Sequence, residues 1–431
     1  MVNIINRSGN EITLQLTLNL SGSMLEMEGQ IQQGVNEVGM AATFEALTRF
    51  ETTGAPIQIG GVKMTALKNK QKKEYETPYG SVVLDRNIYQ TSSGGKTYCP
   101  LDDQARIIVS STPKFAQMIS YKYSSLSARE VSEDLAENHS RHVTRGFIQN
   151  VADTIGSIAQ ATEESFDYII PELSEAVSTV SVSLDGTCVL MKQEGYREAM
   201  TGNISLYNKE GERMHTIYLG AAPEYGRESF INRLQVEVDK VKKKYIDARY
   251  IGIADGAASN WIFLEPNTKH HILDFYHATE YLSEASSAFG CSESTRKQWL
   301  QDACHKLKHE KNGAVNLLKE MTMQQAVISE RKNTSKIIKE KLNKAITYFT
   351  NQHERMHYKK YQEQKFPIGS GVTEAACKTL IKERLCRSGM QWKNTGATIV
   401  LALRALVKTT GRWGQFWSKI NSMGMASIAL A

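Results

Sequence analysis

The stretch STVSVSLDG, residues 178–186, decides how this chain folds. Its β-branched residues alternate with small polar ones, and it ends in Asp-Gly, a pair typical of the point where a strand turns. GNISLYNKEGER (residues 202–213) and MHTIYLG (residues 214–220) continue in the same style, with a turn at Gly211. The sequence therefore predicts three strands joined by hairpins.

The next hundred residues alternate helices with strands. Residues 227–245 repeat apolar side chains on one helical face, and residues 248–256, ARYIGIADG, form a short apolar strand. A short helix at 258–265, a strand at 270–274 and a helix at 275–289 follow. The order β-β-β-α-β-α-β-α is that of a ribonuclease H-like core, so we expect an α/β fold with a mixed sheet.

The flanking segments differ in texture from this core. Residues 291–362 have no strand signal and predict an all-helical insertion. Pro367, Gly369 and Gly371 then predict a loop, and a helix is expected to begin at about Val372. Upstream, residues 125–156 have helix-turn-helix texture, which predicts either a unit that enters a DNA groove or an ordinary helical hairpin. The expected divisions are a helical N-terminal region (1–76), a small β element plus a helix-turn-helix-like DNA-binding region (77–177), the first part of the catalytic core (178–290), the insertion (291–362), and the C-terminal part of the core with a featureless tail (363–431).

Three acidic residues lie at element ends of this predicted core. Asp185 ends the first strand, Asp255 ends the fourth, and Glu374 lies in the first turn of the helix after the insertion. In a sheet of this order the first and fourth strands are neighbours, so the three carboxylates can converge. Clustered carboxylates repel one another unless cations bridge them. Two Mg²⁺ ions, for which Mn²⁺ would substitute, fit oxygen ligands and support phosphodiester cleavage and transfer.

Five motifs in order strengthen this interpretation. SLDGT, IADGA, LDFYHATEYL, PIGSGVTEAACK and RLCRSGMQW, between about Ser181 and Trp392, resemble the ISKra-type insertion-sequence transposases of bacteria, and PLD near Leu101 adds to the likeness. The chain is also similar to mutator-like and hAT transposases, whose ribonuclease H-like core is interrupted by a helical insertion. The resemblance implies that Asp185, Asp255 and Glu374 are the DDE triad.

The resemblance also singles out Asp274 and His277. Relatives carry Cys or Asp, two residues and then His after the second acid, as in Asp274-Phe275-Tyr276-His277 here. One interpretation is a pair that orients the metal site or the scissile phosphate, and the other is a helix-capping Asp with an internally bonded His. Asp274 is also an alternative to Asp255 as metal ligand, although we favour Asp255 because Asp-Gly ends the strand beside the first.

Charge segregation indicates either a polyanionic partner bound along one side of the protein or a set of solvated, Lys-rich helices. Residues 301–431 hold 23 Lys and Arg against 9 Asp and Glu, a net of +14, whereas the whole chain carries +6. Around the Glu374 helix, basic residues would neutralise DNA phosphates. Trp392 and Trp261 would either stack on unpaired bases or, as their type favours, belong to the core. The predicted DNA-binding residues are Lys378, Lys382, Arg384, Arg387, Trp392 and Lys393.

The remaining features limit cofactors and location. The six cysteines are scattered, and Cys99 stands alone before PLD where relatives often have a cysteine pair, so we expect no zinc. We expect no membrane span and no signal peptide, and hence a cytoplasmic, nucleoid-associated bacterial protein.

These expectations together indicate a DNA transposase that cleaves transposon ends and joins the 3′-hydroxyl to target DNA. It would bind double-stranded terminal inverted repeats and target DNA as a homo-oligomer, at least a dimer. The alternatives are a ribonuclease H-like structure-specific endonuclease such as a junction resolvase, and a non-catalytic DNA-binding protein derived from a transposase. A glycosidase with paired carboxylates fits less well, because no aromatic-rich sugar cleft is apparent.

Overall fold

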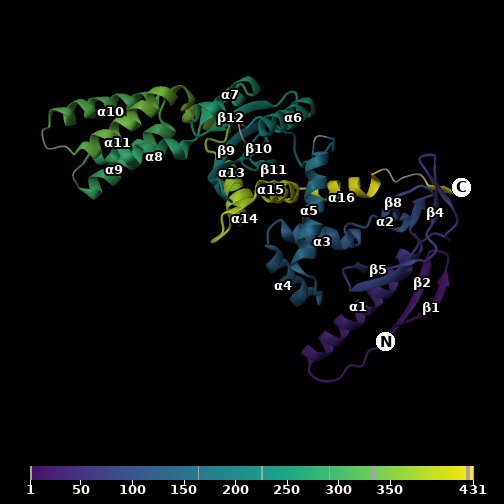
Figure 1. The fold of residues 1–431 in the computed structure, drawn as a ribbon. Helices are drawn as coiled ribbons and strands as arrows, with labels where there is room; N and C mark the ends of the chain where they lie inside the picture. The colour runs from purple at the N-terminus through teal and green to yellow at the C-terminus, as the bar shows by residue number, and fades with distance from the viewer. Residues whose placement is uncertain are drawn as a thin grey trace. The chain divides into compact units, whose positions relative to one another are not determined.

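The computed structural model describes residues 2–163, 165–224, 227–290, 292–331, 335–423 and 428–430, which form two compact units (Figure 1). The first unit comprises residues 1–168, 398–403 and 412–431, and the second comprises residues 169–397 and 404–411. Both units combine helices with sheets, so the predicted mixed α/β class is confirmed. No helix in these described ranges has the length and apolar character needed to cross a membrane.

The second unit is built on a five-stranded sheet of order β11-β10-β9-β12-β13. Strands β9, β10 and β11 are antiparallel neighbours, whereas β12 runs parallel to β9, and β13 runs parallel to β12. The prediction that the first and fourth strands of this region are adjacent is therefore confirmed. The strands are β9 (Thr179–Met191), β10 (Gly195–Tyr207), β11 (Arg213–Ala221), β12 (Arg249–Ala254) and β13 (His270–Leu273).

Three helices connect and cover these strands: α6 (Glu228–Lys244), α7 (Ala258–Asn267) and α8 (Phe275–Ala285). The apolar face predicted for α6 is buried against the sheet, with Phe230 and Leu234 fully buried. Burial of each such side chain contributes about 2–3 kcal/mol. A Cβ at Gly202 of β10 would lie 3.1 Å from both Phe230 and Leu234, so glycine permits this close packing.

The predicted insertion consists of helices joined by short turns, with no strand in its described residues. Figure 1 shows α9, α10 and α11 gathered beside α8, and the buried side chains of Leu307, Leu317 and Leu342 join the same hydrophobic core as the sheet. The helices are α9 (Glu293–His309), α10 (Gly313–Glu330), α11 (Lys336–Gln352) and α12 (Tyr358–Glu363), with 3₁₀ turns at Ser286–Ala288 and His353–Arg355.

The segment after the insertion contains a π-helical stretch. It runs α13 (Gly371–Ala376), π-helix Cys377–Lys382, α14 (Glu383–Leu385) and α15 (Asn394–Lys408). The wider π turns are stabilised by the buried guanidinium of Arg404, which donates to the carbonyls of Leu380, at 2.7 Å, and Thr379. Burial, with the nearby charge of Arg384 adding to it, lowers the pKa of Arg404 to about 10. π turns occur often at functional sites.

The first unit departs from the sequence prediction. Residues 1–76 were expected to be largely helical, but only α1 (Met24–Thr48) is a helix there, and the expectation was wrong. Glu11–Leu16 alternates exposed and half-buried residues, which is strand periodicity, and Gly9 at φ 57° makes the tight turn of its hairpin. The strands are β1 (Val2–Ser8), β2 (Glu11–Leu16), β3 (Ile57–Ile59), β4 (Val62–Ala66) and β5 (Gln71–Glu76).

The rest of this unit combines short strands with helices. The predicted small β element is confirmed, and the tail, expected to be featureless, contains α16, whose apolar face buries Phe416 and Ile420. The remaining elements are β6 (Ser81–Arg86), β7 (Tyr89–Thr91), β8 (Gly94–Tyr98), β14 (Ile428–Leu430), α2 (Pro100–Gln104), α3 (Pro113–Tyr123), α4 (Ala128–His139), α5 (Arg145–Thr162) and α16 (Arg412–Ser422).

Candidate functional site

Asp185 and Asp255 occupy equivalent positions on adjacent parallel strands. The last residues that pair β9 with β12 are Ser183 and Ile253. Asp185 lies two positions after Ser183, and Asp255 lies two positions after Ile253. Adjacent strands lie about 4.8 Å apart. The fold thus places these two carboxyl-bearing residues, 70 positions apart in sequence, side by side.

Asp185 does not end its strand, contrary to the prediction. β9 continues to Met191, paired with β10, and the turn follows at Gln193 and Gly195, with φ of 73° and 71°. Gly186 lies inside β9, paired with Met200 of β10, and a Cβ there would require the carboxylate of Glu198 to move. Only the pairing of β9 with β12 ends near Asp185.

Both aspartates are half-buried and hydrogen-bonded. Asp185 accepts from the amide of Gly186 at 2.7 Å and from the thiol of Cys377 at 3.4 Å. Asp255 accepts from the amide of Ala257 and from the side-chain amide of Asn260, each at 3.1 Å. These contacts fix one oxygen of Asp255 and aim the carboxylates from rigid strands.

Glu374 lies on α13, which packs against β9 and β10. The side-chain amide of Asn203 on β10 donates to the hydroxyl of Thr373 at 2.8 Å, and Thr201 contacts Cys377 at 3.8 Å. These buried contacts hold α13 and the start of the following π-helix on the sheet. The side chain of Glu374 itself is exposed and accepts no hydrogen bond from the described part of the chain.

Asp274 is fully buried and caps α8. One carboxylate oxygen accepts from the amide of His277 at 3.0 Å, and the other accepts from the amide of Ser370, four residues before Glu374. Because both oxygens bind backbone amides, Asp274 has the capping role that was one of its two interpretations, and Asp255 remains the better second acid. His277 is half-buried and lies 3.3 Å from Glu280.

The acids influence one another electrostatically. Burial raises the pKa of Asp185, and the negative charge of Asp255 raises it further. Burial likewise raises the pKa of Glu374, with contributions from Asp274 and Asp185, whereas His277 lowers the pKa values of both Asp185 and Glu374. Within the described ranges no three His, Cys, Asp or Glu side chains are arranged to hold a metal ion. The sheet therefore gathers the acids without setting them at ligand distances.

The raised pKa of Asp185, caused first by burial and then by the charge of Asp255, predicts a pH-dependent stability effect. Because the pKa of Asp185 is higher in the folded than in the unfolded state, the carboxyl favours folding at acidic pH and opposes it as pH rises above about 4. In EDTA, Asp185→Asn should therefore raise the Tm relative to the parent protein at about pH 7.5, with the difference lost near pH 4. Scanning calorimetry at both pH values measures this difference. Equal Tm values for the variant and the parent at both pH values would contradict the raised pKa of Asp185.

Helix α11 of the insertion fixes the loop that carries Asp255. The hydroxyl of Tyr348 donates to the carbonyl of Asp255 at 2.7 Å, and the side-chain amide of Gln352 donates to the carbonyl of Gly256 at 3.1 Å. The ring of Tyr348 stacks on Tyr281 of α8, with centroids 3.7 Å apart. The insertion thus contributes to the placement of the second acid.

Tyr348→Phe tests this positioning role. We expect a loss of about 1 kcal/mol in the free energy of unfolding, as for one hydrogen bond. We also expect a roughly tenfold lower rate of the metal-dependent DNA cleavage that the sequence motifs predict. The matched control is Tyr250→Phe, which removes a 3.0 Å phenol-to-carbonyl bond near the other end of β12 and should leave the rate unchanged. Equal rates in the two variants would exclude a positioning role for Tyr348.

The predicted DNA-contacting residues divide by exposure. Lys378, Lys382 and Lys393 are exposed, and Arg387 is half-buried. Arg384 is only 2% exposed, and its guanidinium lies 5.0 Å from the ring centre of Trp392. The prediction that Arg384 contacts DNA phosphates was therefore wrong.

The two tryptophans have structural surroundings. Trp392 donates from its indole nitrogen to the carbonyl of Leu385 at 2.9 Å, and its backbone bonds Leu190 and Lys192 at the end of β9. Trp261 is 4% exposed beneath Arg355, with 4.5 Å from guanidinium to ring centre. The core interpretation is confirmed for Trp261, and Trp392 anchors its segment to β9.

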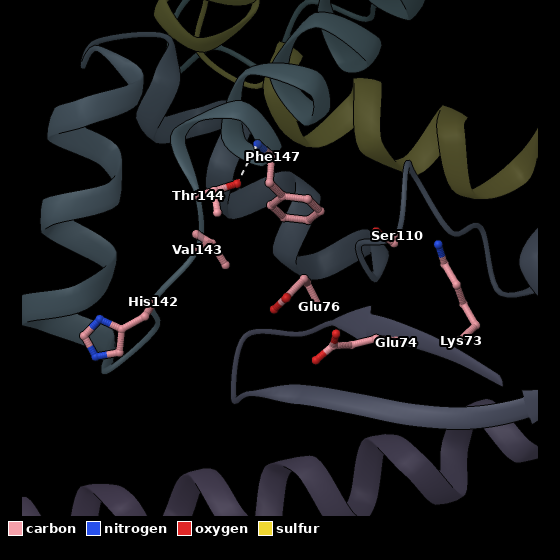
Figure 2. A pocket seen from close by; sticks show the side chains of 8 residues that line it. All are labelled: Lys73, Glu74, Glu76, Ser110, His142, Val143, Thr144 and Phe147. Atoms are coloured by element: carbon pink, nitrogen blue, oxygen red, sulfur yellow. Dashed lines mark hydrogen bonds between the residues drawn. The ribbon is translucent and has the colours of Figure 1, made fainter.

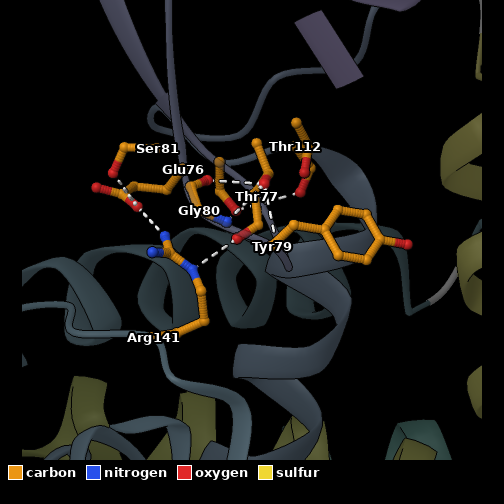
Figure 3. A network of polar contacts seen from close by, with 8 residues as sticks. Glu76, Thr77, Tyr79, Gly80, Ser81, Thr112 and Arg141 are labelled. Carbon is orange, nitrogen blue, oxygen red and sulfur yellow. Dashed lines mark hydrogen bonds and ion pairs between the residues drawn. The ribbon is translucent and has the colours of Figure 1, made fainter. Parts of the chain in front are cut away.

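In the first unit, the predicted helix-turn-helix texture corresponds to α4 and α5, joined through Ser140 at φ 51°. The turn packs on the β5–β6 hairpin. Buried Arg141 donates to the carbonyl of Thr77 at 2.9 Å and pairs with Glu76 (Figure 3).

A cavity of about 320 Å³ lies between this turn and the hairpin (Figure 2). Its lining mixes Lys73 and His142 with Glu74 and Glu76, beside the first turn of α5 at Thr144. Glu74 and Glu76 beside the N-terminus of α5 would repel a phosphate group that approached this cavity.

Comparison with protein-family models finds no match, and comparison with curated proteins likewise finds none. The functional assignment therefore depends on the site and the sequence motifs.

Proposed function

We propose that this chain is a DDE-type DNA transposase whose second unit is a ribonuclease H-like catalytic core. It would cleave the ends of its element and transfer the 3′-hydroxyl to target DNA. The observation that supports this most is the equivalent placement of Asp185 and Asp255 on β9 and β12. The sheet order, with three antiparallel strands and two parallel additions, supports the same conclusion.

The donor set fits Mg²⁺. Asp185, Asp255 and Glu374 offer only oxygen ligands, which this ion prefers. The pKa values of Asp185 and Glu374 are raised mainly by burial and further by neighbouring carboxylates, and a bound cation would offset both effects. Two bound Mg²⁺ ions supply activation of an attacking oxygen and stabilisation of the leaving oxygen. These three acids would hold the ions.

Other residues of the chain would position these groups. Asp274 ties the start of α8 to the segment that precedes Glu374, and Cys377 and Asn260 orient the two aspartates. His277, whose charge acts on both Asp185 and Glu374, would stand beside the scissile phosphate.

The proposed substrate is double-stranded DNA, both as terminal inverted repeats and as target. Exposed Lys378, Lys382 and Lys393 follow the Glu374 helix and would neutralise phosphates near the acids. Holding two ends together would require a homo-oligomer, at least a dimer. A bacterial cytoplasmic, nucleoid-associated location accords with this substrate.

An assay on DNA tests the proposal. Purified full-length protein is incubated with the DNA that flanks its gene, in Mg²⁺, Mn²⁺ or EDTA, together with a supercoiled target plasmid. Metal-dependent cuts at inverted repeats, followed by joined end–target products, are expected. Cleavage of branched junctions without joining would favour the structure-specific endonuclease, and binding without metal-dependent cutting would favour the non-catalytic DNA-binding protein.

A further inference from the structure

A second candidate site lies at the amino end of β13, away from the acids that follow the carboxyl end of β12. A cavity of about 430 Å³ opens there between the start of β13 and the segment joining α11 to α12. Its wall includes Lys269, His270, Lys360 and His357, with Glu354 as the one carboxylate among the lining residues. The proposed catalytic residues do not line it.

The cavity is positively charged. Lys269 and Lys360 are exposed, and neither has an ion-pair partner within the described ranges. Burial lowers the pKa of His270, and the charge of Lys360 lowers it further, with smaller contributions from Arg249, His271 and Lys269. The two lysines therefore lie at one opening whose lining includes a single carboxylate, that of Glu354.

An adjoining cavity of about 460 Å³ extends the same surface. It shares His357 and Lys360 with the first and adds Lys311 and Lys359, opposed by Glu310 and Glu363. Lysine side chains therefore continue along α12, but in the second cavity two carboxylates offset their charge. The first cavity is the better anion site.

A metal ion is a poorer occupant. Residues 353–357 read His-Glu-Arg-Met-His, a spacing that holds zinc when both histidines lie on one continuous helix. Here α11 ends at Gln352, the next three residues form a 3₁₀ turn, and the helical chain resumes only at Tyr358. Glu354 lies 3.1 Å from the Nε2 of His353 and 4.0 Å from that of His357. No described group of side chains is arranged as a metal site.

We propose that the cavity formed by Lys269, His270, His357 and Lys360 binds a phosphate group. The two sources of such a group are the backbone of bound DNA and a free phosphate. Binding of the DNA backbone in this cavity rests on the proposed function, whereas binding of a free phosphate does not. A DNA contact here would lie about 13 Å from the acids, the length of a four-residue strand, and would hold the duplex at a second point.

Two binding measurements, both in EDTA, distinguish these sources. One titrates a fluorescein-labelled duplex of about 20 base pairs and follows anisotropy between 50 and 200 mM salt, a range over which phosphate contacts are resolved. The other titrates inorganic phosphate at constant ionic strength and follows heat. If the cavity binds the DNA backbone, Lys269→Ala/Lys360→Ala should weaken DNA binding about three- to tenfold and lower the slope of its salt dependence by one to two. If the cavity binds free phosphate, the same variant should weaken phosphate binding about three- to tenfold.

Two further variants make the result specific. Lys319→Ala/Lys341→Ala removes the same charge from exposed positions on α10 and α11 outside the cavity and should have a smaller effect. Glu354→Gln removes the cavity's carboxylate and should tighten anion binding about two- to threefold, a gain that misfolding cannot produce.

The outcomes separate cleanly. A response confined to the phosphate arm assigns the cavity to free phosphate, and a response in the DNA arm assigns it to the backbone. Equal effects of the two lysine pairs in both arms would overturn the proposal, as would zinc binding that His270→Gln/His357→Gln abolishes. If the parent protein binds no DNA at all, the proposed function fails while the phosphate arm still reports on the cavity.

Discussion

Replacing Asp185 or Asp255 by Asn, or Glu374 by Gln, is expected to reduce metal-dependent DNA cleavage at least about a thousandfold, or about 4 kcal/mol in transition-state stabilisation. An amide keeps the size of each side chain but removes the charge that would hold the cations. DNA binding in EDTA should change little, because the exposed lysines are untouched. Gel-based cleavage of end-labelled DNA and anisotropy measure the two quantities on the same preparations.

The matched control is Asp302→Asn, which removes a carboxylate from the exposed surface of α9 while retaining an amide-sized side chain. Its cleavage rate should equal that of the parent. Retained cutting in one acid variant would remove that residue from the triad. Retained cutting in all three would refute the proposed catalytic centre.

Asp274→Ala is expected to lower the free energy of unfolding by about 3 kcal/mol. The substitution leaves two buried amides, those of His277 and Ser370, without their acceptor, and it uncaps α8. It should also reduce cleavage, because the Ser370 segment leads directly into the helix of Glu374. Urea denaturation followed by circular dichroism measures the stability, with cleavage measured below the transition.

Asp274→Asn provides the comparison. Asparagine caps helices nearly as well as aspartate, but it retains only one acceptor oxygen, so about half of the loss is expected. The order of stability should be parent, then Asn, then Ala. An Ala variant as stable as the parent would mean that neither amide depends on this carboxylate.

Local periodicity was enough to predict the core of the second unit. The apolar face of α6, with Phe230, Leu234 and Val238, is buried as its spacing indicated, and each predicted strand from residue 179 to 273 is present. The order of strands and helices also predicted that β9 and β12 are neighbours, since short connections and parallel crossovers leave few arrangements. These features depend on residues close together in sequence.

Features set by distant contacts were missed. The Asp185-Gly186 pair suggested a turn, yet β10 supplies a partner for all of β9 and keeps it extended. Arg384 looked like a surface cation, but it is buried beneath Trp392 in a segment that bonds β9. The thiol of Cys377 meets Asp185 across 192 positions, which no local pattern indicates.

The short N-terminal strands were missed for a different reason. Strands such as Ile57–Ile59 and Val62–Ala66 span only three to five residues, too few for their alternation to stand out. The exception is Glu11–Leu16, where alternation is present and identifies a strand once the turn at Gly9 is considered.

The Asp255 loop is anchored by Tyr348, and the helix of Glu374 is attached to β10 through Thr373, which has a consequence for biosynthesis. The centre cannot assemble when β9 and β12 leave the ribosome, because the residues that complete it are made about 90 to 120 positions later. A nascent chain thus carries its first two acids without the helix that steadies them. Activity that needs all three acids would therefore begin only after the Glu374 helix has been synthesised.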